Sequence, residues 1–577
     1  MLGAAKAKRF SRREFVRSAT LVAGVVAALP VLSACAPSGP AAPKAEAPKP
    51  AAPTEAAKAA PAAAPTAAPA ATAPSRGGEL KIGLYRTFEN LDPAVYWGPP
   101  ETMVTQMVFD SLVYLGNDLK FHPGLAESWE VSEGGKVLTF KLRRGVKFHD
   151  GTDLKADAVK FHFDRCVDPA TKSKYARSLL GPYDSTVVMD DYTVQLRLKS
   201  AYAPILDSLS QGYLGIPSPT AVKKFGDQFE DNLVGSGPFK FVEWKRDSQL
   251  ILERNSDYAW GVTFPDKTNP GLSHVDRLIF KFIPEVGTRD ALMDGRKEIN
   301  VEAWPGTQSL PRWRKDTNYK VHDGVSPGTT WLNFINVEKP PTSELAVRQA
   351  INFAVDKDTI VKKFFEGVSL PTWNLLGTTT FGYDKTLDSI YSYDPARARD
   401  LLEKAGWKVG ADGARTKEGQ PLQLDVFTSS GEKEAYKELM AAQLQDAGFS
   451  VKLITGTGAE RAVAGSKGLY HLINRQFEAS DPHFLVDLFH SQGIGTFAWS
   501  MARDADLDKM LEEQDATLEL DRRKATIVRA TKHILEQAYV VPIYLSLFTW
   551  VTTADVQDFH MDARSWYPYF QDASLKQ

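Results

Sequence analysis

Cysteine is nearly absent from this sequence, whose 577 residues include only Cys35 and Cys166. Two cysteines cannot build the disulfide framework of a small secreted domain, and they cannot supply the ligands of a cysteine-based zinc site. Cys166 follows Val159 and Phe163 at helical spacing, which places its sulfur on an apolar helix face. We therefore expect Cys166 to be a buried structural thiol rather than a reactive one.

Motifs for catalysis are also missing. A match to G-x-S-x-G occurs at 324–328 (GVSPG), but the oxyanion hole of that motif takes the backbone N–H of the next residue. Here that residue is Pro327, which has no N–H. The stretch GTGAER at 456–461 lacks the third glycine of a dinucleotide-binding fingerprint, and no P-loop motif occurs. His483 and His490 are seven residues apart, which is a poor separation for a shared metal. We predict no enzyme, no cofactor and no metal.

The apolar run near the N-terminus is too short for a permanent membrane anchor. Residues 19–32 fall short of the roughly 20 residues that a spanning helix needs, and Pro30 interrupts them. Basic residues precede this run and small residues follow it, up to Cys35. This is the layout of an export signal, so we predict that residues 1–34 direct export.

Two short motifs in this region resemble known export sequences. SRREFV resembles the twin-arginine motif, with Arg12 and Arg13 as the pair, and LSAC resembles a bacterial lipoprotein box. The second resemblance implies that Cys35 becomes the acylated first residue of the mature protein, anchored in the membrane by its acyl chains. The alternative is an ordinary cleaved signal with an incidental cysteine.

Large apolar residues are missing after the signal. Residues 36–75 contain no Leu, Ile, Val, Phe, Tyr or Trp and consist almost entirely of Ala and Pro. Such a segment cannot bury a core, and its prolines keep it extended. We expect residues 35–76 to be a lipid-anchored linker to a body that starts near Gly77.

The sequence also lacks an excess of positive charge. Its net charge is −2, and loss of residues 1–34, with six Lys or Arg and one Glu, would change it to −7. Binding to nucleic acid phosphates needs a basic face. Nucleic acid is therefore not an expected partner.

The body contains a mixture of strand and helix patterns. Apolar residues alternate at 80–84, 138–142 and 194–198, as they do in half-buried strands. In 394–406 an aspartate can cap a helix that a proline begins and a glycine ends, and two further helices are predicted to join at Asp356. These patterns predict an α/β fold, and the length is enough for two or three domains.

Several blocks of the body resemble one family, the family-five extracytoplasmic solute-binding proteins, which includes the dipeptide- and oligopeptide-binding components of ABC importers. The blocks follow the family's order and span nearly the whole body. They are AESWEVSEGGKVLTFKLRRGVKFHDGTDLKADAVKFHFDR, GSGPFKFVEW, LILERNSDYAW, LNFINVEKPPTSELAVRQAINFAVDKDTIVKKFFEG and YSYDPARARDLLEKAGW.

The resemblance implies a periplasmic-binding-protein-like type II clamp of two lobes, which close over a ligand about a hinge. An inserted domain gives three domains in all. The implied boundaries are 77–111, 218–325 and 546–577 for domain I, 112–217 for domain II, and 326–545 for domain III. The GVSPG stretch falls near a crossover between lobes, where its glycines would give the backbone freedom during closure.

The function that the resemblance implies is that of a substrate-binding lipoprotein of an ABC importer. It would capture di- or oligopeptides in the interlobe cleft and deliver them to permease subunits in the membrane. The family implies a monomer, held outside the cytoplasm at the outer face of the cytoplasmic membrane. Two alternatives remain open: an oligosaccharide receptor of the same fold, and a surface sensor or assembly lipoprotein without a transport role.

The resemblance also suggests where the ligand is held. In peptide-binding relatives a carboxylate four residues before the proline of a D/E-P segment holds the peptide amine, and the matching residue in INRQFEASDPHFL is Glu478. Relatives often have Trp three residues before that carboxylate, where this sequence has Arg475. An arginine there could pair with a ligand carboxylate or with Glu478 itself. Asp481 is expected to cap a helix that begins after Pro482.

Aromatic residues supply the remaining candidates. NLDPAVYWGPPETM corresponds to an early loop that lines the cleft in the family, so Tyr96 and Trp97 are candidates for an aromatic face against the ligand. Packing at a domain junction is the alternative for both. Phe477 and Trp499 are further candidates, although large aromatic residues more often belong to the core.

Overall fold

The computed structural model describes residues 77–96, 98–173, 175–261, 263–264, 267–295, 298–411, 413–429, 434–476 and 479–576. The predicted export signal, the linker and Cys35 lie outside these ranges, as do Trp97, Phe477 and Glu478. The described residues all belong to one compact unit. Within the described part of the chain, no helix combines the length and apolar character that crossing a membrane requires.

An eleven-stranded mixed sheet forms the centre of the fold. Its strands lie in the order β18-β17-β19-β12-β20-β11-β1-β10-β9-β8, and β13 pairs with β20. The strands are β1 Glu79–Leu84, β8 Phe239–Lys245, β9 Gln249–Arg254, β10 Arg277–Phe282, β11 Val301–Ala303, β12 Tyr319–Ile335, β13 Ser369–Pro371, β17 Gln423–Ser429, β18 Ser450–Gly456, β19 Leu472–Gln476 and β20 Val540–Thr553.

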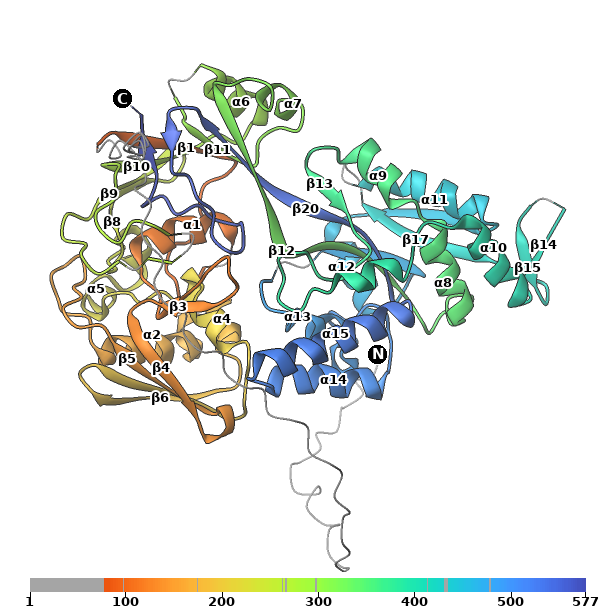
Figure 1. Cartoon of the computed structure of the whole chain (residues 1–577), viewed down its shortest axis with the longest axis horizontal. Coiled ribbons are helices and arrows are strands. Elements are labelled where there is room, and N and C mark those ends of the chain that lie inside the picture. Colours follow the sequence, from red (N-terminus) through yellow and green to blue (C-terminus); the bar gives the residue numbers. More distant parts are fainter. Residues whose placement is uncertain are drawn as a thin grey trace, which may run out of the picture. The chain divides into compact units, whose positions relative to one another are not determined.

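Two long strands join the two halves of this sheet. β12 and β20 lie side by side as an antiparallel pair, with Tyr319 opposite Thr553 at one end and Phe334 opposite Val540 at the other (Figure 1). The sheet continues from β20 through β11 and β1 to β8, and from β12 through β19 and β17 to β18. The pairing of β12 with β20 is irregular at 325–330.

The GVSPG stretch, 324–328, lies inside β12. A side chain at Gly324 would place its Cβ 2.2 Å from that of Ser565, and one at Gly328 would lie 2.3 Å from the carbonyl oxygen of Ala479. Gly328 also has a φ of +74°, which disfavours other residues. The close approach of the segments that contain Ser565 and Ala479 therefore accounts for these two glycines, independently of any role in closure.

A separate four-stranded antiparallel sheet has the order β4-β5-β7-β6. Its strands are β4 Ala126–Ser132, β5 Val137–Leu142, β6 Tyr183–Asp190 and β7 Thr193–Leu198. Helix α2, Ala156–Val167, packs on this sheet and carries Cys166, which has no exposed surface. Burial raises the pKa of its thiol, so the prediction of a buried structural cysteine is confirmed.

Helices occupy the connections between the strands. In addition to α2 they are α1 Pro99–Val108, α3 Ala176–Leu179, α4 Ile205–Leu209, α5 Pro219–Phe225, α6 Val286–Asp294, α7 Leu310–Trp313, α8 Leu345–Ala354, α9 Lys357–Phe364, α10 Pro395–Lys404, α11 Tyr436–Asp446, α12 Gly458–Ser466, α13 Phe484–Phe489, α14 Ala505–Ala516 and α15 Leu520–Glu536. Short strands complete the fold, namely β2 Val113–Leu115, β3 Phe121–Pro123, β14 Lys408–Val409, β15 Arg415–Lys417, β16 Gln420–Pro421, β21 Val556–Gln557 and β22 Ser574–Leu575.

Local capping signals predicted two helix starts correctly and one incorrectly. Asp394 accepts a hydrogen bond from the backbone N–H of Arg397 (2.9 Å) at the start of α10, and Asp356 caps α9. Asp481 does not cap the helix that follows Pro482, because α13 starts at Phe484 with His483 as its N-cap residue. Its carboxylate accepts a hydrogen bond from the backbone N–H of His483 at 2.8 Å and forms an ion pair with Arg523, 42 residues away in the sequence.

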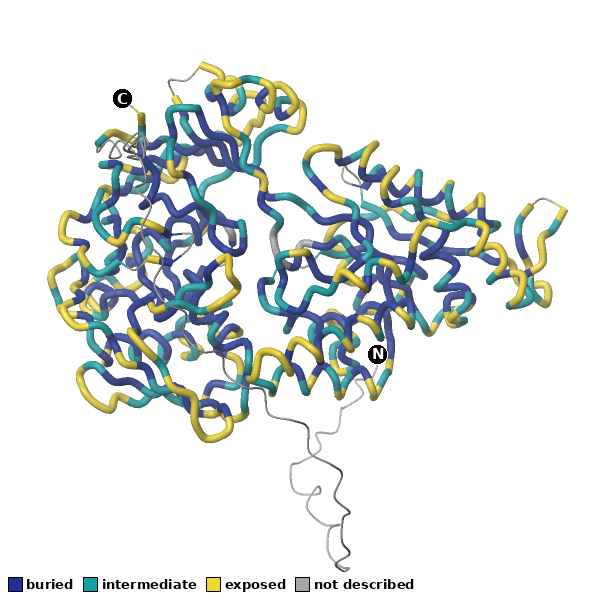
Figure 2. Tube along the Cα trace, viewed as in Figure 1, coloured by how far each residue is buried: buried dark blue, intermediate teal, exposed yellow. Residues whose placement is uncertain are grey.

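The buried hydrophobic residues gather in several clusters. One cluster unites residues within 80–109, 221–303 and 548–573, a second lies within 94–216, and two others lie within 332–544. Figure 2 shows the buried residues concentrated along the strands, including nearly all of β20. The mixed α/β class is confirmed, whereas the three-domain boundaries stay a prediction.

Candidate functional site

A cavity of about 600 Å³, counting its mouth, lies between two segments that are distant in the sequence. One segment spans 175–211 and contains α3 and α4, and the other spans 479–487 and leads into α13. Three carboxylates line this cavity, which we call the aspartate cavity: Asp207, Asp481 and Asp487.

The position of the second segment follows from the sheet. Strands β17, β18 and β19 are parallel to one another, so their carboxyl ends lie on the same edge. Residues 479–487 begin three positions after Gln476, the last residue of β19, and therefore lie near that edge. The carboxyl ends of parallel strands are where open α/β sheets bind their ligands.

Asp207 connects three parts of the chain. Its Oδ2 accepts hydrogen bonds from the hydroxyl of Ser480 (2.7 Å) and from the amide of Gln211 (2.9 Å). Its Oδ1 accepts a hydrogen bond from Nη2 of Arg564 at 2.8 Å, and Asp207 and Arg564 are both buried. The pair brings the C-terminal segment against the two segments that line the aspartate cavity.

Asp481 is held by a second buried arginine. Arg523 donates two hydrogen bonds to the Asp481 carboxylate, at 2.7 and 2.6 Å. Burial by itself would raise the pKa of Asp481, but the charge and hydrogen bonds of Arg523 outweigh it, and the pKa is lowered. Asp481 is therefore a paired anion at the wall of the cavity.

His483 also joins the two sides of the cavity. Its Nδ1 lies 2.6 Å from Oδ2 of Asp515, and its ring makes an edge contact with Tyr202 at 5.5 Å between centroids. Burial opposes protonation of His483, but Asp515 outweighs burial and raises the pKa of the imidazole. The backbone N–H of Ala203 donates to the carbonyl of Asp515 at 2.7 Å.

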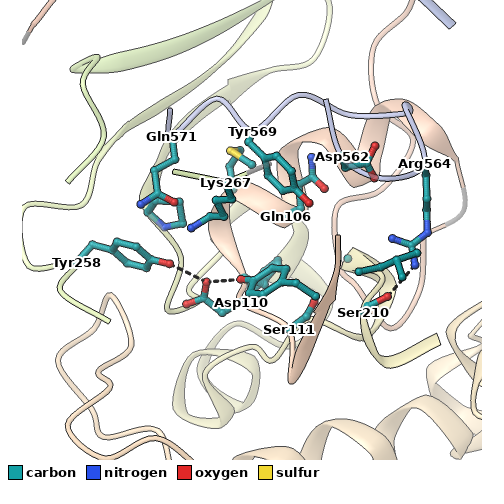
Figure 3. A pocket seen from close by; sticks show the side chains of 16 residues that line it. Gln106, Asp110, Ser111, Ser210, Tyr258, Lys267, Asp562, Arg564, Tyr569 and Gln571 are labelled. Carbon is teal, nitrogen blue, oxygen red and sulfur yellow. Dashed lines mark hydrogen bonds between the residues drawn. The ribbon is translucent and has the colours of Figure 1, made fainter. Parts of the chain in front are cut away.

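A second cavity, of about 560 Å³ including its open part, lies beside α1 under the C-terminal segment 562–571 (Figure 3). We call it the Asp110 cavity. Asp110 is buried and accepts hydrogen bonds from four donors: the hydroxyls of Tyr114, Tyr258 and Ser236, and the indole of Trp260. Burial raises the pKa of Asp110, and it lowers that of the neighbouring Lys267.

Arg564 lies between the two cavities. It lines the Asp110 cavity, donates to Ser210 at 2.7 Å and pairs with Asp207 at the aspartate cavity. Figure 3 shows its guanidinium directed to Ser210, on the side away from Asp110. In the described part of the chain no cluster of three or more His, Cys, Asp or Glu could hold a metal ion.

The family profile described as bacterial extracellular solute-binding proteins, family 5 Middle, matches residues 120–496. The chain belongs to this family. Its fold is accordingly the mixed α/β, multi-domain fold of type II periplasmic binding proteins, as the sequence resemblance implied.

Two curated proteins and one solved structure are similar to this chain. The dipeptide-binding protein of Escherichia coli (strain K12) is 32% identical over 311 residues, which span 50% of this chain and 55% of that protein. The di/tripeptide-binding protein 1 of Pseudomonas aeruginosa (strain UCBPP-PA14) is 29% identical over 82% of this chain and 89% of its own length. The structure of DppA, an ABC transporter-associated periplasmic binding protein from Helicobacter pylori in complex with the peptide STSA, is 26% identical. It covers 87% of this chain and 99% of that chain, with a TM-score of 0.67.

Arg475 is a predicted ligand-binding residue at a position where relatives often have tryptophan. It lies on β19, between two aromatic rings. Its guanidinium carbon is 4.2 Å from the ring centroid of Phe497 and 4.9 Å from that of Trp499. Burial lowers the pKa of Arg475 to about 10. Trp499 is buried, its indole donates to the carbonyl of Thr496, and its ring packs on Gly465. Ligand contact by Arg475 and Trp499 stays a prediction.

Tyr96 lies in the core of the second hydrophobic cluster. Its ring stacks on Tyr213 at 4.7 Å, and its hydroxyl is 3.1 and 2.8 Å from the hydroxyls of Thr102 and Thr105. Only 1% of its surface is exposed. This burial fits the alternative considered from the sequence, in which Tyr96 is a packing residue. Direct contact of Tyr96 with a ligand stays a prediction.

The sequence did not single out several residues that line the aspartate cavity. Asp207, Asp487, Tyr175 and Tyr202 occur in no motif, and their neighbours along the chain give no sign of a cavity. They come together through contacts between segments almost 300 residues apart. Glu478 and Phe477 precede the lining residue Ala479 but lie outside the described residues.

Proposed function

We propose that this protein is the substrate-binding component of an ABC importer, that it captures di- or oligopeptides in the aspartate cavity, and that it delivers them to permease subunits in the membrane. The observation that carries the proposal is the cavity itself. It lies at the carboxyl ends of parallel strands in a family-five fold and is closed by two segments far apart in sequence. Peptide binding is also what the names of the two curated relatives above and the description of the Helicobacter pylori structure state.

The chemistry of the cavity suits a peptide. Its walls combine aromatic side chains such as Tyr175 and Tyr202 with carboxylates, so apolar surface and charge are both offered within about 600 Å³. Hydrogen bonds to charged groups are worth about 1.5–3 kcal/mol, which makes peptide termini effective anchors. We assign the peptide amine to Glu478, and we keep Arg475 as a candidate for a ligand carboxylate.

We further propose that the protein works as a lipoprotein monomer outside the cytoplasm. Acylation of Cys35 and the linker 35–76 would keep the receptor close to the permease and raise its effective concentration there. Mass spectrometry of protein extracted from membranes tests this: a mature chain that starts at an acylated Cys35 is expected, and an unmodified chain in the soluble fraction would contradict it.

Thermal melts of the full-length protein against pools of peptides, oligosaccharides and metal chelates test the ligand class. A true ligand at a hundredfold excess over its dissociation constant adds about 2.7 kcal/mol of stability. Stabilisation by the peptide pool is expected, with loss of the effect in Glu478→Gln. Stabilisation by sugars that survives Glu478→Gln but disappears in Trp97→Ala would overturn the peptide assignment.

A further inference from the structure

We propose that Asp487 is a ligand-binding residue that holds a positively charged group, so that the aspartate cavity prefers peptides with a lysine or arginine side chain. This inference rests on the proposed function and adds a substrate class to it. It depends on which carboxylates of the cavity already have partners.

Two of the three aspartates are fully engaged within the protein. Asp207 accepts hydrogen bonds from Arg564, Ser480 and Gln211, and both of its oxygens are used. Asp481 receives two hydrogen bonds from Arg523 and one from the backbone N–H of His483. A ligand cation could reach either carboxylate only by competing with a buried arginine.

Asp487 differs from both of these aspartates. It is half-buried on α13, and no described residue donates a hydrogen bond to its carboxylate or lies within ion-pair distance of it. His483, one turn earlier, is engaged with Asp515 at 2.6 Å. The positive charges of His483 and Arg475 act on Asp487 from beyond ion-pair distance. Among the described residues, Asp487 is therefore the aspartate of this cavity without a directly bound cation.

Burial gives this arrangement an energetic cost. It raises the pKa of Asp487, and the negative charge of Asp515 adds to the rise, while His483 and Arg475 oppose it. A partly desolvated carboxylate without a direct partner gains when a cation arrives, because the cation replaces the hydration that the carboxylate lost on folding.

Aromatic rings near Asp487 favour the same kind of ligand. Tyr175 and Tyr202 line the cavity, and both phenols are close enough for the charge of Asp487 to raise their pKa further, although burial is the main cause. Their hydroxyls are therefore neutral at ordinary pH. The faces of such rings attract ammonium and guanidinium groups. A long basic side chain could place its alkyl part against the rings and its charge at Asp487.

Calorimetry with a pair of dipeptides on the full-length protein separates charge from shape. Ala-Lys and Ala-norleucine have side chains of similar length, but only the first carries a positive charge. The native protein is expected to bind Ala-Lys about tenfold more tightly, since a charge-assisted hydrogen bond is made only with lysine. Asp487→Asn should weaken Ala-Lys about tenfold and leave Ala-norleucine unchanged, and Asp487→Glu should retain the preference.

Matched controls keep the test specific. Asp506→Asn removes an aspartate of α14 whose side chain is 82% exposed, and it should change neither affinity. Equal affinities in the native protein, or equal weakening of both peptides by Asp487→Asn, would overturn this inference and leave peptide capture intact. If neither of these peptides nor any in a mixed pool binds the native protein, the inference and the proposed function fail together.

Discussion

The two cavities of this protein differ in how the carboxylates that line them are paired. In the Asp110 cavity, four fixed donors surround one carboxylate; burial raises the pKa of Asp110, and the hydrogen bonds and the charge of the nearby Lys267 oppose this rise. In the aspartate cavity, arginines hold Asp207 and Asp481, whereas Asp487 has no direct partner among the described residues. A buried carboxylate whose hydrogen-bond donors all come from the protein stabilises the fold. A carboxylate without such a partner can bind a ligand cation.

This difference predicts separate responses to mutation. Changes at Asp110 should lower the stability of the protein. Changes at Asp487 and Glu478 should alter ligand affinity at little cost to the fold, and a change at the His483–Asp515 pair should alter the pH dependence of stability.

Asp110→Ala is expected to have the largest effect. The substitution leaves four donors, of which Ser236 and Tyr258 are buried, without their acceptor and removes the negative charge next to Lys267. Losses of this kind cost about 3–5 kcal/mol. Urea denaturation of the full-length protein measures the loss. Asp506→Asn serves as the exposed control, and a shift in midpoint no larger than that of the control would show that Asp110 is not a structural centre.

Glu478→Gln should lower ligand affinity rather than stability. If Glu478 holds the peptide amine, loss of its charge removes about 1.5–3 kcal/mol of binding, or roughly 10- to 100-fold in affinity. Calorimetry with the peptide that stabilises the native protein most measures this. The unfolding midpoint without ligand should stay within the range of the Asp506→Asn control. Unchanged affinity would remove Glu478 from the site and contradict its assignment.

Most of the fold could be predicted because its signals are local. Alternating apolar residues at 80–84 and 138–142 mark β1 and β5, and the aspartates at 356 and 394 mark the starts of α9 and α10. Each pattern involves residues a few positions apart, whose periodicity or hydrogen bonding is fixed by the element itself. The family blocks then placed these elements in a known architecture.

Site residues could be predicted only where they belong to a motif of consecutive residues. The capping prediction for Asp481 failed because α13 begins at Phe484, with His483 as its N-cap residue. The ion pair of Asp481 with Arg523 could not be predicted because the arginine lies 42 residues later. Asp487 and Asp207 were missed because pairing between distant segments decides which carboxylate is neutralised. The exposure of Tyr96 is likewise set by Tyr213, more than 100 residues away.

The ion pair of His483 with Asp515 should make stability depend on pH. The folded state raises the pKa of His483, so the pair contributes most below the ordinary pKa of about 6.5, and its contribution is lost as the pH rises through the folded value. The melting temperature should therefore fall over that interval, by an amount equivalent to no more than about 1 kcal/mol. Asp515→Asn should flatten the profile, and an unchanged profile in this variant would contradict a charged pair.

Asp487→Asn should have the smallest effect on stability and is the most direct test of the comparison. The substitution removes a partly desolvated charge but no hydrogen bond to a described residue, so the free energy of unfolding without ligand should change by less than about 0.5 kcal/mol. Urea denaturation of Asp487→Asn and Asp110→Ala under the same conditions compares their free energies of unfolding directly. A large loss of unfolding free energy in Asp487→Asn would mean that Asp487 stabilises the fold as Asp110 does. The two cavities would then differ in shape but not in the structural role of their carboxylates.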